Sequence, residues 1–157
     1  LKFLGKYFFL SLMTLFQNMQ EFVVKKFCIT ISLLLMCASG KAEVIEIGNK
    51  ALASLIEKQV PIIDIRRQEE WDQTGIIEGS ILMTFFDKDG KAKVNTWLQD
   101  LDLVANKNEP FILICRTGRR TGLVANFLSE KLKYAKVFDV TDGITEWIKK
   151  GNIVVKP

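Results

Sequence analysis

The chain has 157 residues, which suits one domain with an appended leader, and it contains no histidine. The missing histidine excludes Cys-His and Ser-His catalysis and argues against a zinc site made of protein side chains. The net charge of +4 arises in residues 1–42, which hold five of the 22 basic and one of the 18 acidic residues, so 17 of each remain in residues 43–157. We therefore expect no nucleic-acid partner, because such a partner requires a basic surface on the folded part.

Residues 1–42 have the three parts of an export signal. A basic pair, an apolar run and three small residues follow one another: Lys25 and Lys26, then 27–36, then Ala38, Gly40 and Ala42. The apolar run is ten residues long, well short of the roughly 20 that a membrane-spanning helix needs. We predict cleavage after Ala42 or Gly40 and a periplasmic or secreted domain over residues 43–157. An uncleaved signal would instead anchor the protein, so the membrane is a partner only through this segment.

Cysteine usage singles out one thiol. Cys28 and Cys37 lie in the leader, so the exported domain would carry only Cys115 and could form no internal disulfide. A lone thiol in an oxidising compartment is either buried and inert or present to react.

Short apolar runs alternate with helical periodicity along residues 43–157. In chain order we predict strand 44–47, helix 49–58, strand 61–65, helix 68–73, strand 80–83, turn 87–90, helix 94–104, strand 111–115, helix 120–132, strand 137–140 and helix 143–150. Asn49 has a side chain that can cap the first helix. Every connection is long enough for a parallel crossover, which predicts an α/β three-layer sandwich of about five mostly parallel strands flanked by helices. Ligands of such sheets bind beyond the carboxyl ends of strands, where Cys115 falls.

The aromatic residues and the acidic segment 87–90 lie mostly between the predicted strands. We weigh a structural role against a binding role for each. Trp71, Trp97 and Trp147 recur at helical positions and are predicted to pack in the core, whereas Phe85 and Phe86 fit a pocket wall or the core equally well. Residues 87–90, Asp-Lys-Asp-Gly, resemble the start of a calcium loop but lack its later ligands, including the closing glutamate, so we predict a turn. We expect no metal and no cofactor.

The stretch that carries chemistry is the one that follows the apolar strand 111–115. It reads Cys115, Arg116, Thr117, Gly118, Arg119, Arg120 and Thr121. Consecutive backbone N–H groups at such a strand-to-helix turn form an anion site, and the helix dipole adds positive potential. Helix N-termini and neighbouring cations also favour thiolate over thiol. A cysteine at a strand end is usually a small core residue, but three arginines within five residues favour a catalytic role for Cys115.

The motif Cys-Arg-Thr-Gly-x-Arg-Thr resembles the active-site loop of single-domain rhodaneses, the thiosulfate sulfurtransferase family. Segments 62–66, 69–71, 75–81 and 142–147 resemble further landmarks of that family in the right order. The chain differs at Ile76 and Glu78, where histidine and proline are common. The resemblance covers residues 44–155, and the cysteine loop is its most specific part.

The resemblance implies ping-pong sulfur transfer. The Cys115 thiolate would attack the outer sulfur of thiosulfate or a persulfide and carry it as a persulfide to cyanide or a thiol, a protein thiol included. The substrate-binding residues would be Arg116, Thr117, Gly118, Arg119, Arg120 and Thr121. Arg116 and Arg119 are the best candidates for gripping a sulfonate, while Arg120 either binds substrate or braces the loop. Asp64 and Arg66, with Glu69, are expected to form a supporting ion-pair brace beneath the loop.

Two alternatives remain open at this stage. The first is a persulfide carrier or redox-sensing module that serves one protein partner, which the sequence hardly separates from a free-standing enzyme. The second is a cysteine-dependent phosphatase or arsenate reductase. Those enzymes place an arginine six positions after the cysteine, whereas here position six is Thr121 and the arginine stands at position five. The tighter loop favours a sulfur atom over phosphate.

Overall fold

The structure is a computed structural model that describes residues 42–157. Its elements are β1 (Glu43–Ile47), α2 (Asn49–Glu57), β2 (Ile62–Asp64), α3 (Gln68–Thr74), β3 (Ile81–Leu82), α4 (Val94–Asp102), β4 (Phe111–Ile114), α5 (Arg119–Asn126), the π-helical turn η1 (Phe127–Lys131), β5 (Lys136–Val140) and α6 (Gly143–Lys149). Residues 1–41 of the predicted signal, and with them the predicted cleavage after Gly40, lie outside the described residues.

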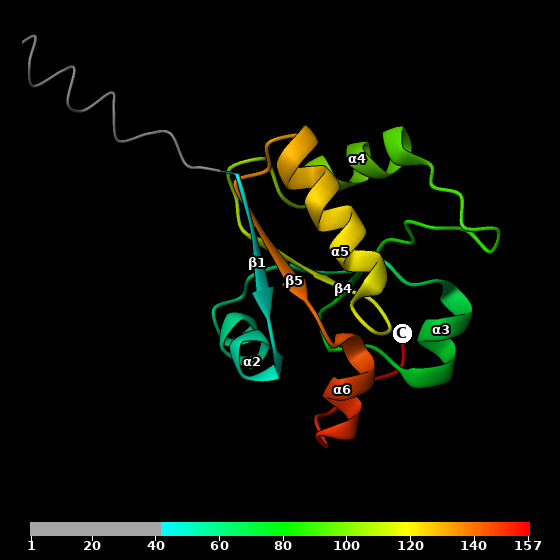
Figure 1. Cartoon of the computed structure of the whole chain (residues 1–157). Helices are drawn as coiled ribbons and strands as arrows, with labels where there is room; N and C mark the ends of the chain where they lie inside the picture. Colours follow the sequence, from blue (N-terminus) through cyan, green and yellow to red (C-terminus); the bar gives the residue numbers. More distant parts are fainter. Residues whose placement is uncertain (1–41) are drawn as a thin grey trace, which may run out of the picture. The chain divides into compact units, whose positions relative to one another are not determined.

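The five strands form one parallel sheet in the order β1-β5-β4-β2-β3. All residues of β4 and β2 are buried, as expected for central strands covered on both faces. Helices α4 and α5 lie on one side of the sheet, and α2 and α6 lie on the other (Figure 1). The predicted α/β sandwich with five parallel strands is therefore confirmed.

Two apolar clusters fill the layers. Side chains of α4 and α5 pack with Phe111 and Leu113 on one face of β4, and side chains of α2 and α6 pack with Ile112 and Ile114 on the other. This alternation follows from the two-residue period of a strand. Both clusters hold β4 rigidly in the middle of the sheet, so the residue that follows it has a fixed position.

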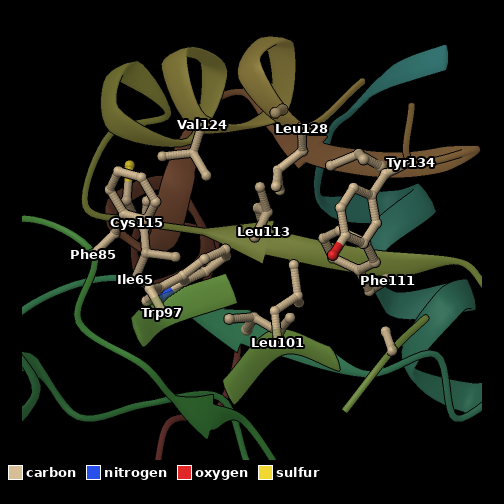
Figure 2. Close-up of a cluster of buried hydrophobic side chains, with 14 residues drawn as sticks. Ile65, Phe85, Trp97, Leu101, Phe111, Leu113, Cys115, Val124, Leu128 and Tyr134 are labelled. Carbon is tan, nitrogen blue, oxygen red and sulfur yellow. The ribbon is translucent and has the colours of Figure 1, made fainter. Parts of the chain in front are cut away.

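The aromatic side chains behave largely as predicted. Trp71, Trp97 and Trp147 are all buried, which confirms that they pack in the core. Phe85 is also buried, and its ring packs edge-to-face against Trp97 with centroids 4.9 Å apart, as part of the cluster in Figure 2. Phe86 is only partly buried and packs against the same cluster. Both phenylalanines line one surface pocket and Phe86 lines a second, so each has a core role and a pocket role.

Two local predictions were wrong. Gly48, not Asn49, is the N-cap of α2, and both polar atoms of the Asn49 side chain are buried without a hydrogen-bond partner among the described residues. The helix starts one residue early, so the Asn49 side chain occupies the first helical turn instead of capping it. The helix expected over 120–132 is regular only to Asn126 and then widens into η1, which ends before Lys133 in left-handed conformation.

Within residues 42–157, none of the helices is long and apolar enough to cross a membrane.

Candidate active site

Cys115 directly follows the buried strand β4 and is itself buried, with 1% of its surface exposed. It belongs to the same cluster as Phe85, Ile65 and Val124, and Figure 2 shows its sulfur at one end of that cluster, away from Phe111. The thiol is therefore almost closed off from solvent, and it lies between the hydrophobic core and the loop that follows it.

The loop turns sharply at Gly118, which adopts a left-handed conformation with φ 82°. A Cβ at this position would collide with the backbone carbonyl of Thr141, at the end of β5. Gly143 meets the loop from the other side, since a Cβ there would lie 2.5 Å from the carbonyl carbon of Arg116. Both glycines are thus required by close backbone approach as well as by conformation.

The start of α6 fixes the loop carbonyls. The N–H of Ile144 donates to the carbonyl of Cys115 at 2.9 Å. Both the N–H and the hydroxyl of Thr145 donate to the carbonyl of Arg116, at 3.1 and 2.8 Å. These three hydrogen bonds set the orientation of the peptide groups that follow Cys115.

The backbone N–H groups of the loop have no partner in the part of the chain that the structure describes. Among residues 42–157, no acceptor pairs with the N–H groups of residues 116–121, and the first helical hydrogen bond runs from Gly122 to the Gly118 carbonyl at 2.9 Å. Several adjacent unpaired donors at a helix start make an anion-binding cradle. The sequence predicted this cradle, and the geometry of the loop fits it.

Thr121 is the polar neighbour of the sulfur. Its side chain is fully buried, its hydroxyl donates to the Gly118 carbonyl at 2.8 Å, and its oxygen lies 3.6 Å from Cys115 Sγ. In this orientation the oxygen can accept a hydrogen bond from the thiol, and a rotated hydroxyl can donate to a thiolate. Thr121 is thus placed to contact the sulfur in either state.

Arg120 is paired with Glu70 of α3. Its Nη1 and Nη2 donate to the two carboxylate oxygens at 2.7 and 2.5 Å. This hydrogen bonding raises the pKa of Arg120 against the opposing effect of burial, and the Cys115 side chain adds a smaller increase. Burial raises the pKa of Glu70, but hydrogen bonds from Arg120 and the Arg67 backbone outweigh it and leave that pKa below its usual value. Of the two roles expected for Arg120, the pairing fits the brace.

Asp64 and Arg66 form a second, fully buried ion pair, with both side chains 0% exposed. Arg66 donates to both Asp64 oxygens, and its remaining N–H groups reach Thr74 Oγ1 at 2.6 Å and the Gly75 carbonyl at 2.9 Å. The pair therefore holds the end of α3, the helix that carries Glu70. Among the described residues, the polar contacts of the Arg66 side chain link it to α3 and to Gly75, and none runs to the cysteine loop.

The expectation that Glu69 joins this brace was wrong. Its carboxylate lies 3.7 Å from Arg67 Nε and is exposed. The donors of Arg66 are already occupied, and Glu69 lies on the outer side of the first turn of α3. The neighbouring Glu70 takes the role that links α3 to the loop.

Three of the predicted binding residues are open to solvent. Arg116, Thr117 and Arg119 are exposed, and within the described part of the chain neither arginine makes an ion pair. Their guanidinium groups are therefore available to an incoming anion.

Asp139 on β5 is a buried acid that the sequence did not point to. It is 5% exposed, and its Oδ1 has no hydrogen-bond partner among the described residues. Burial raises its pKa, the Thr121 side chain lowers it, and repulsion from Glu46 raises it, so that the pKa lies above its usual value. Asp139 thus lies behind the loop, on the strand next to β4, as an acid that is costly to ionise.

Other residues that position the loop were also missed. Glu70 could not be distinguished from Glu69, because both stand in the same acidic pair before Trp71. Ile144 and Thr145 act through the position of α6, although the Gly143 motif marked that segment as a family landmark. The polar turn 87–90 was predicted only as a connection, yet it borders a pocket beside the loop.

Comparison with known proteins decides the family. The family model described as "Rhodanese-like domain" matches residues 49–150. A rhodanese domain-containing protein of Drosophila melanogaster is 34% identical over 97 residues, which are 58% of this chain and 84% of the relative. The chain belongs to the rhodanese-like domain family.

Solved structures agree with this assignment. A rhodanese-related protein of Thermoplasma volcanium has a TM-score of 0.56 and 26% identity, over 72% of this chain and 99% of that protein. The polysulfide-sulfur transferase homodimer of Wolinella succinogenes has a TM-score of 0.57 and 18% identity, over 85% and 92% of the two chains. A possible tyrosine phosphatase of Rhodopseudomonas palustris has a TM-score of 0.51 and 22% identity, over 71% and 85%. The last two likenesses show the fold alone, so the chemistry of this rhodanese has to be inferred from its own loop.

Proposed function

We propose that this rhodanese is a sulfurtransferase that moves a sulfane sulfur from thiosulfate or a persulfide to cyanide or a thiol through a persulfide on Cys115. One observation carries the proposal. The only thiol of residues 42–157 directly precedes a loop whose six N–H groups, at residues 116–121, have no acceptor among the described residues. Such a cradle supports a negatively charged sulfur just above Cys115.

The reaction balances without a redox partner. The Cys115 thiolate attacks the outer sulfur of thiosulfate, the S–S bond breaks, and sulfite leaves with the electron pair. The acceptor then attacks the outer sulfur of the persulfide, and the pair of the second broken S–S bond returns to Cys115. With cyanide the product is thiocyanate, and with a thiolate it is a new persulfide.

The role proposed for each loop side chain follows from how exposed that side chain is. Arg116 and Arg119, which are exposed, would bind the sulfonate of the donor. Thr121, which is buried beside the sulfur, would contact the thiolate and the persulfide root. Arg120, held by Glu70, adds a fixed positive charge near the sulfur.

The phosphatase alternative is less well supported by the same loop. Position six holds the buried Thr121, and the arginine at position five is directed to Glu70. No guanidinium therefore stands at the place from which a phosphatase loop encircles its tetrahedral substrate. The loop is better suited to a single sulfur atom than to phosphate.

The test is a parallel assay of residues 43–157 with thiosulfate and cyanide and with a phosphate ester. We expect thiocyanate from the wild-type protein, none from Cys115→Ser, and no phosphate release from either. Phosphate release without thiocyanate would reverse the proposal. Retention of full activity by Cys115→Ser would remove every mechanism that passes through this thiol.

We further propose that the domain is exported. The support is the basic, apolar and small-residue pattern of residues 25–42. The intact mass of the protein recovered from the periplasmic or secreted fraction of a bacterial host should correspond to cleavage after Ala42 or Gly40. Recovery of the whole chain from the membrane fraction would show an uncleaved anchor instead.

A further inference from the structure

A groove of about 600 Å³ lies on the face of the domain that α2 and α6 cover. Figure 1 shows these two helices on the same side of the sheet, opposite α4 and α5. The groove is formed by α2, the turn that follows α3, the end of α6 and the C-terminal segment 151–153. None of its lining residues belongs to the cysteine loop, so it is a second surface and not part of the site described above. The lining residues that matter here are Ile56, Glu57, Ile77, Glu78, Trp147 and Ile153.

The buried part of the groove is apolar and its exposed part is acidic. Trp147 and Ile77 are buried, and Ile56 is partly buried. Glu57 and Glu78 are exposed, and neither carboxylate forms an ion pair within residues 42–157. The groove therefore offers an apolar surface together with two negative charges that no cation of the described chain offsets.

The C-terminal wall of the groove is held in place by hydrogen bonds. Trp147 Nε1 donates to the Ile153 carbonyl at 3.0 Å, and the Asn152 side chain donates to the Trp147 carbonyl at 2.9 Å. Val155 and Ile76 exchange two backbone hydrogen bonds of 2.9 Å, which join the segment to the turn after α3. The groove is thus already formed in the protein alone, without a bound molecule to assemble it.

The shape of the groove suits a protein better than a small molecule. The Ile153 side chain, on one wall, is 81% exposed although its backbone is fixed. A small-molecule site encloses roughly 70–90% of its ligand, and a wall that is this exposed leaves the groove shallow. An apolar centre with polar groups around it is the arrangement of a protein–protein interface.

The stability of the fold does not explain the acids or the wall. Glu57 is the last residue of α2, where a negative charge is unfavourable because it lies at the negative end of the helix dipole. Glu78 lies in an exposed turn, and like Glu57 it has no cation paired with it in the described chain. The wall 151–153 lies beyond residues 49–150, which match the family model.

We propose that this groove docks a segment of a partner protein in which an apolar side chain is flanked by lysine or arginine. The apolar side chain would pack against Ile56, Ile77 and Ile153, and the cations would pair with Glu57 and Glu78. Charge complementarity decides the chemistry of the partner, because an acidic segment would be repelled by both carboxylates. The proposal is independent of the sulfurtransferase function, since the two sites share no residue.

The probe is a cysteine-free library of random peptides displayed on phage and selected on the immobilised full chain. We expect the enriched peptides to share an apolar residue with lysine or arginine beside it. Synthetic copies of these peptides are then titrated with the protein and followed by fluorescence anisotropy. Enrichment of acidic peptides, or of peptides without a common pattern, would overturn the proposal.

Variants of the groove show whether the enriched peptides bind there. Glu57→Gln and Glu78→Gln should each weaken binding about two- to fivefold, the effect of one exposed ion pair. Ile153→Ser should weaken it about tenfold, because an apolar contact is lost. If none of the three variants weakens binding, the peptides bind elsewhere and the proposal is wrong.

Two matched controls lie outside the groove. Glu130 is an exposed acid without an ion pair in the described chain, and Leu103 is 87% exposed. Neither residue lines the groove. Glu130→Gln and Leu103→Ser should change peptide binding less than about twofold. Losses equal to those of the groove variants would show a general effect of surface charge or apolar exposure and would overturn the assignment.

Further measurements separate the docking surface from the chemistry and from self-association. Cys115→Ser should bind the peptides as the wild type does, whereas loss of binding would place them at the cysteine loop and overturn the groove. Glu57→Gln and Glu78→Gln should leave the thiosulfate and cyanide reaction unchanged, so failure of one proposal does not imply failure of the other. In sedimentation velocity, concentration-dependent association that Ile153→Ser abolishes would assign the groove to a second copy of the chain and overturn the partner.

Discussion

Arginine side chains have two different roles in this rhodanese. The roles differ in whether the guanidinium N–H groups are already bonded within the protein or are open to a ligand. Arg66 lies in the interior and is fully buried. Its guanidinium group donates hydrogen bonds to Asp64, Thr74 and the backbone. Arg116 and Arg119, at the loop, are exposed and make no ion pair within residues 42–157. The buried arginine stabilises one conformation, whereas the exposed arginines retain the capacity to bind a ligand.

Arg120 lies between these two cases. It is half-buried, it is paired with Glu70, and it also lies near the Cys115 sulfur. The interior pair fixes α3, α3 carries Glu70, and Glu70 fixes Arg120. One helix, α3, thus connects the interior ion pair to the cysteine loop. Substitutions at the interior end should mainly lower stability, and substitutions at the loop end should mainly lower activity.

The largest expected effect comes from breaking the interior pair. Arg66→Met leaves the Asp64 carboxylate buried without its counter-ion, which costs about 3–5 kcal/mol of unfolding free energy. Urea denaturation followed by circular dichroism measures this loss. The double variant Asp64→Leu/Arg66→Met should recover part of it, and a single-variant cost below about 1 kcal/mol would show that the pair is not the brace described.

The next effect concerns the backbone of the loop. Gly118→Ala introduces a Cβ that collides with the Thr141 carbonyl at φ 82°, and we expect a loss of about 2–4 kcal/mol together with loss of activity. Gly90→Ala is the control, because Gly90 has φ 76° but nothing within 4 Å of its Cβ position. It should cost only about 1 kcal/mol. Equal costs for the two variants would refute close packing of the loop.

The exposed arginines should affect catalysis and not stability. Arg116→Ala and Arg119→Ala should each lower kcat/KM for thiosulfate about ten- to a hundredfold, since each removes a charge-assisted hydrogen bond to the sulfonate. Their unfolding free energies should stay within about 0.5 kcal/mol of the wild type. Steady-state kinetics and urea denaturation of the same preparations separate the two quantities. A large loss of unfolding free energy with an unchanged kcat/KM for thiosulfate would show that these arginines stabilise the fold and do not bind the donor.

The Glu70–Arg120 pair should make stability depend on acid pH. The folded-state pKa of Glu70 lies below its unfolded value near 4.5, so the folded protein binds fewer protons than the unfolded chain in that window. The pair's contribution, about 1 kcal/mol, is present above pH 4.5 and is lost as the pH falls through the folded pKa. In Glu70→Gln, thermal unfolding at a series of pH values should lack this step. An unchanged step would assign it to another carboxylate.

An effect of similar size contrasts two buried acids: Asp64 has hydrogen-bond partners, whereas one oxygen of Asp139 has none among the described residues. The pKa of Asp139 lies above its unfolded value of 3.8, so its ionisation disfavours the folded state as the pH rises through that folded pKa. Asp139→Asn should therefore gain about 1 kcal/mol at pH 7 and nothing near pH 3. A gain that is the same at both pH values would come from packing and not from charge.

Most of the fold could be predicted from the sequence because its signals are local. The buried runs of β2 and β4, the alternation of strands and helices, and the burial of the tryptophans follow from apolar periodicity. The cap of α2 and the widening into η1 could not be predicted, since each depends on where neighbouring elements place one residue. The identity of the family followed from the contiguous cysteine loop.

The remainder of the site depends on contacts between distant segments. The pairing of Arg120 with Glu70 spans 50 residues, and Thr145 reaches the Arg116 carbonyl over 29 residues. No spacing rule distinguishes Glu70 from Glu69, so only the orientation of α3 decides which acid meets the loop. The pocket beside the loop could not be predicted for the same reason, because Lys88 and Arg119 line it together only when the turn 87–90 folds beside the start of α5.

The persulfide on Cys115 can be detected in the intact mass of residues 43–157 after incubation with thiosulfate. We expect an increase by the mass of one sulfur atom, mapped to Cys115 by peptide analysis and removed by cyanide with release of thiocyanate. Cys115→Ser should show no increase. A wild-type mass that stays unchanged under thiosulfate and under a small persulfide donor would show that Cys115 does not carry sulfur.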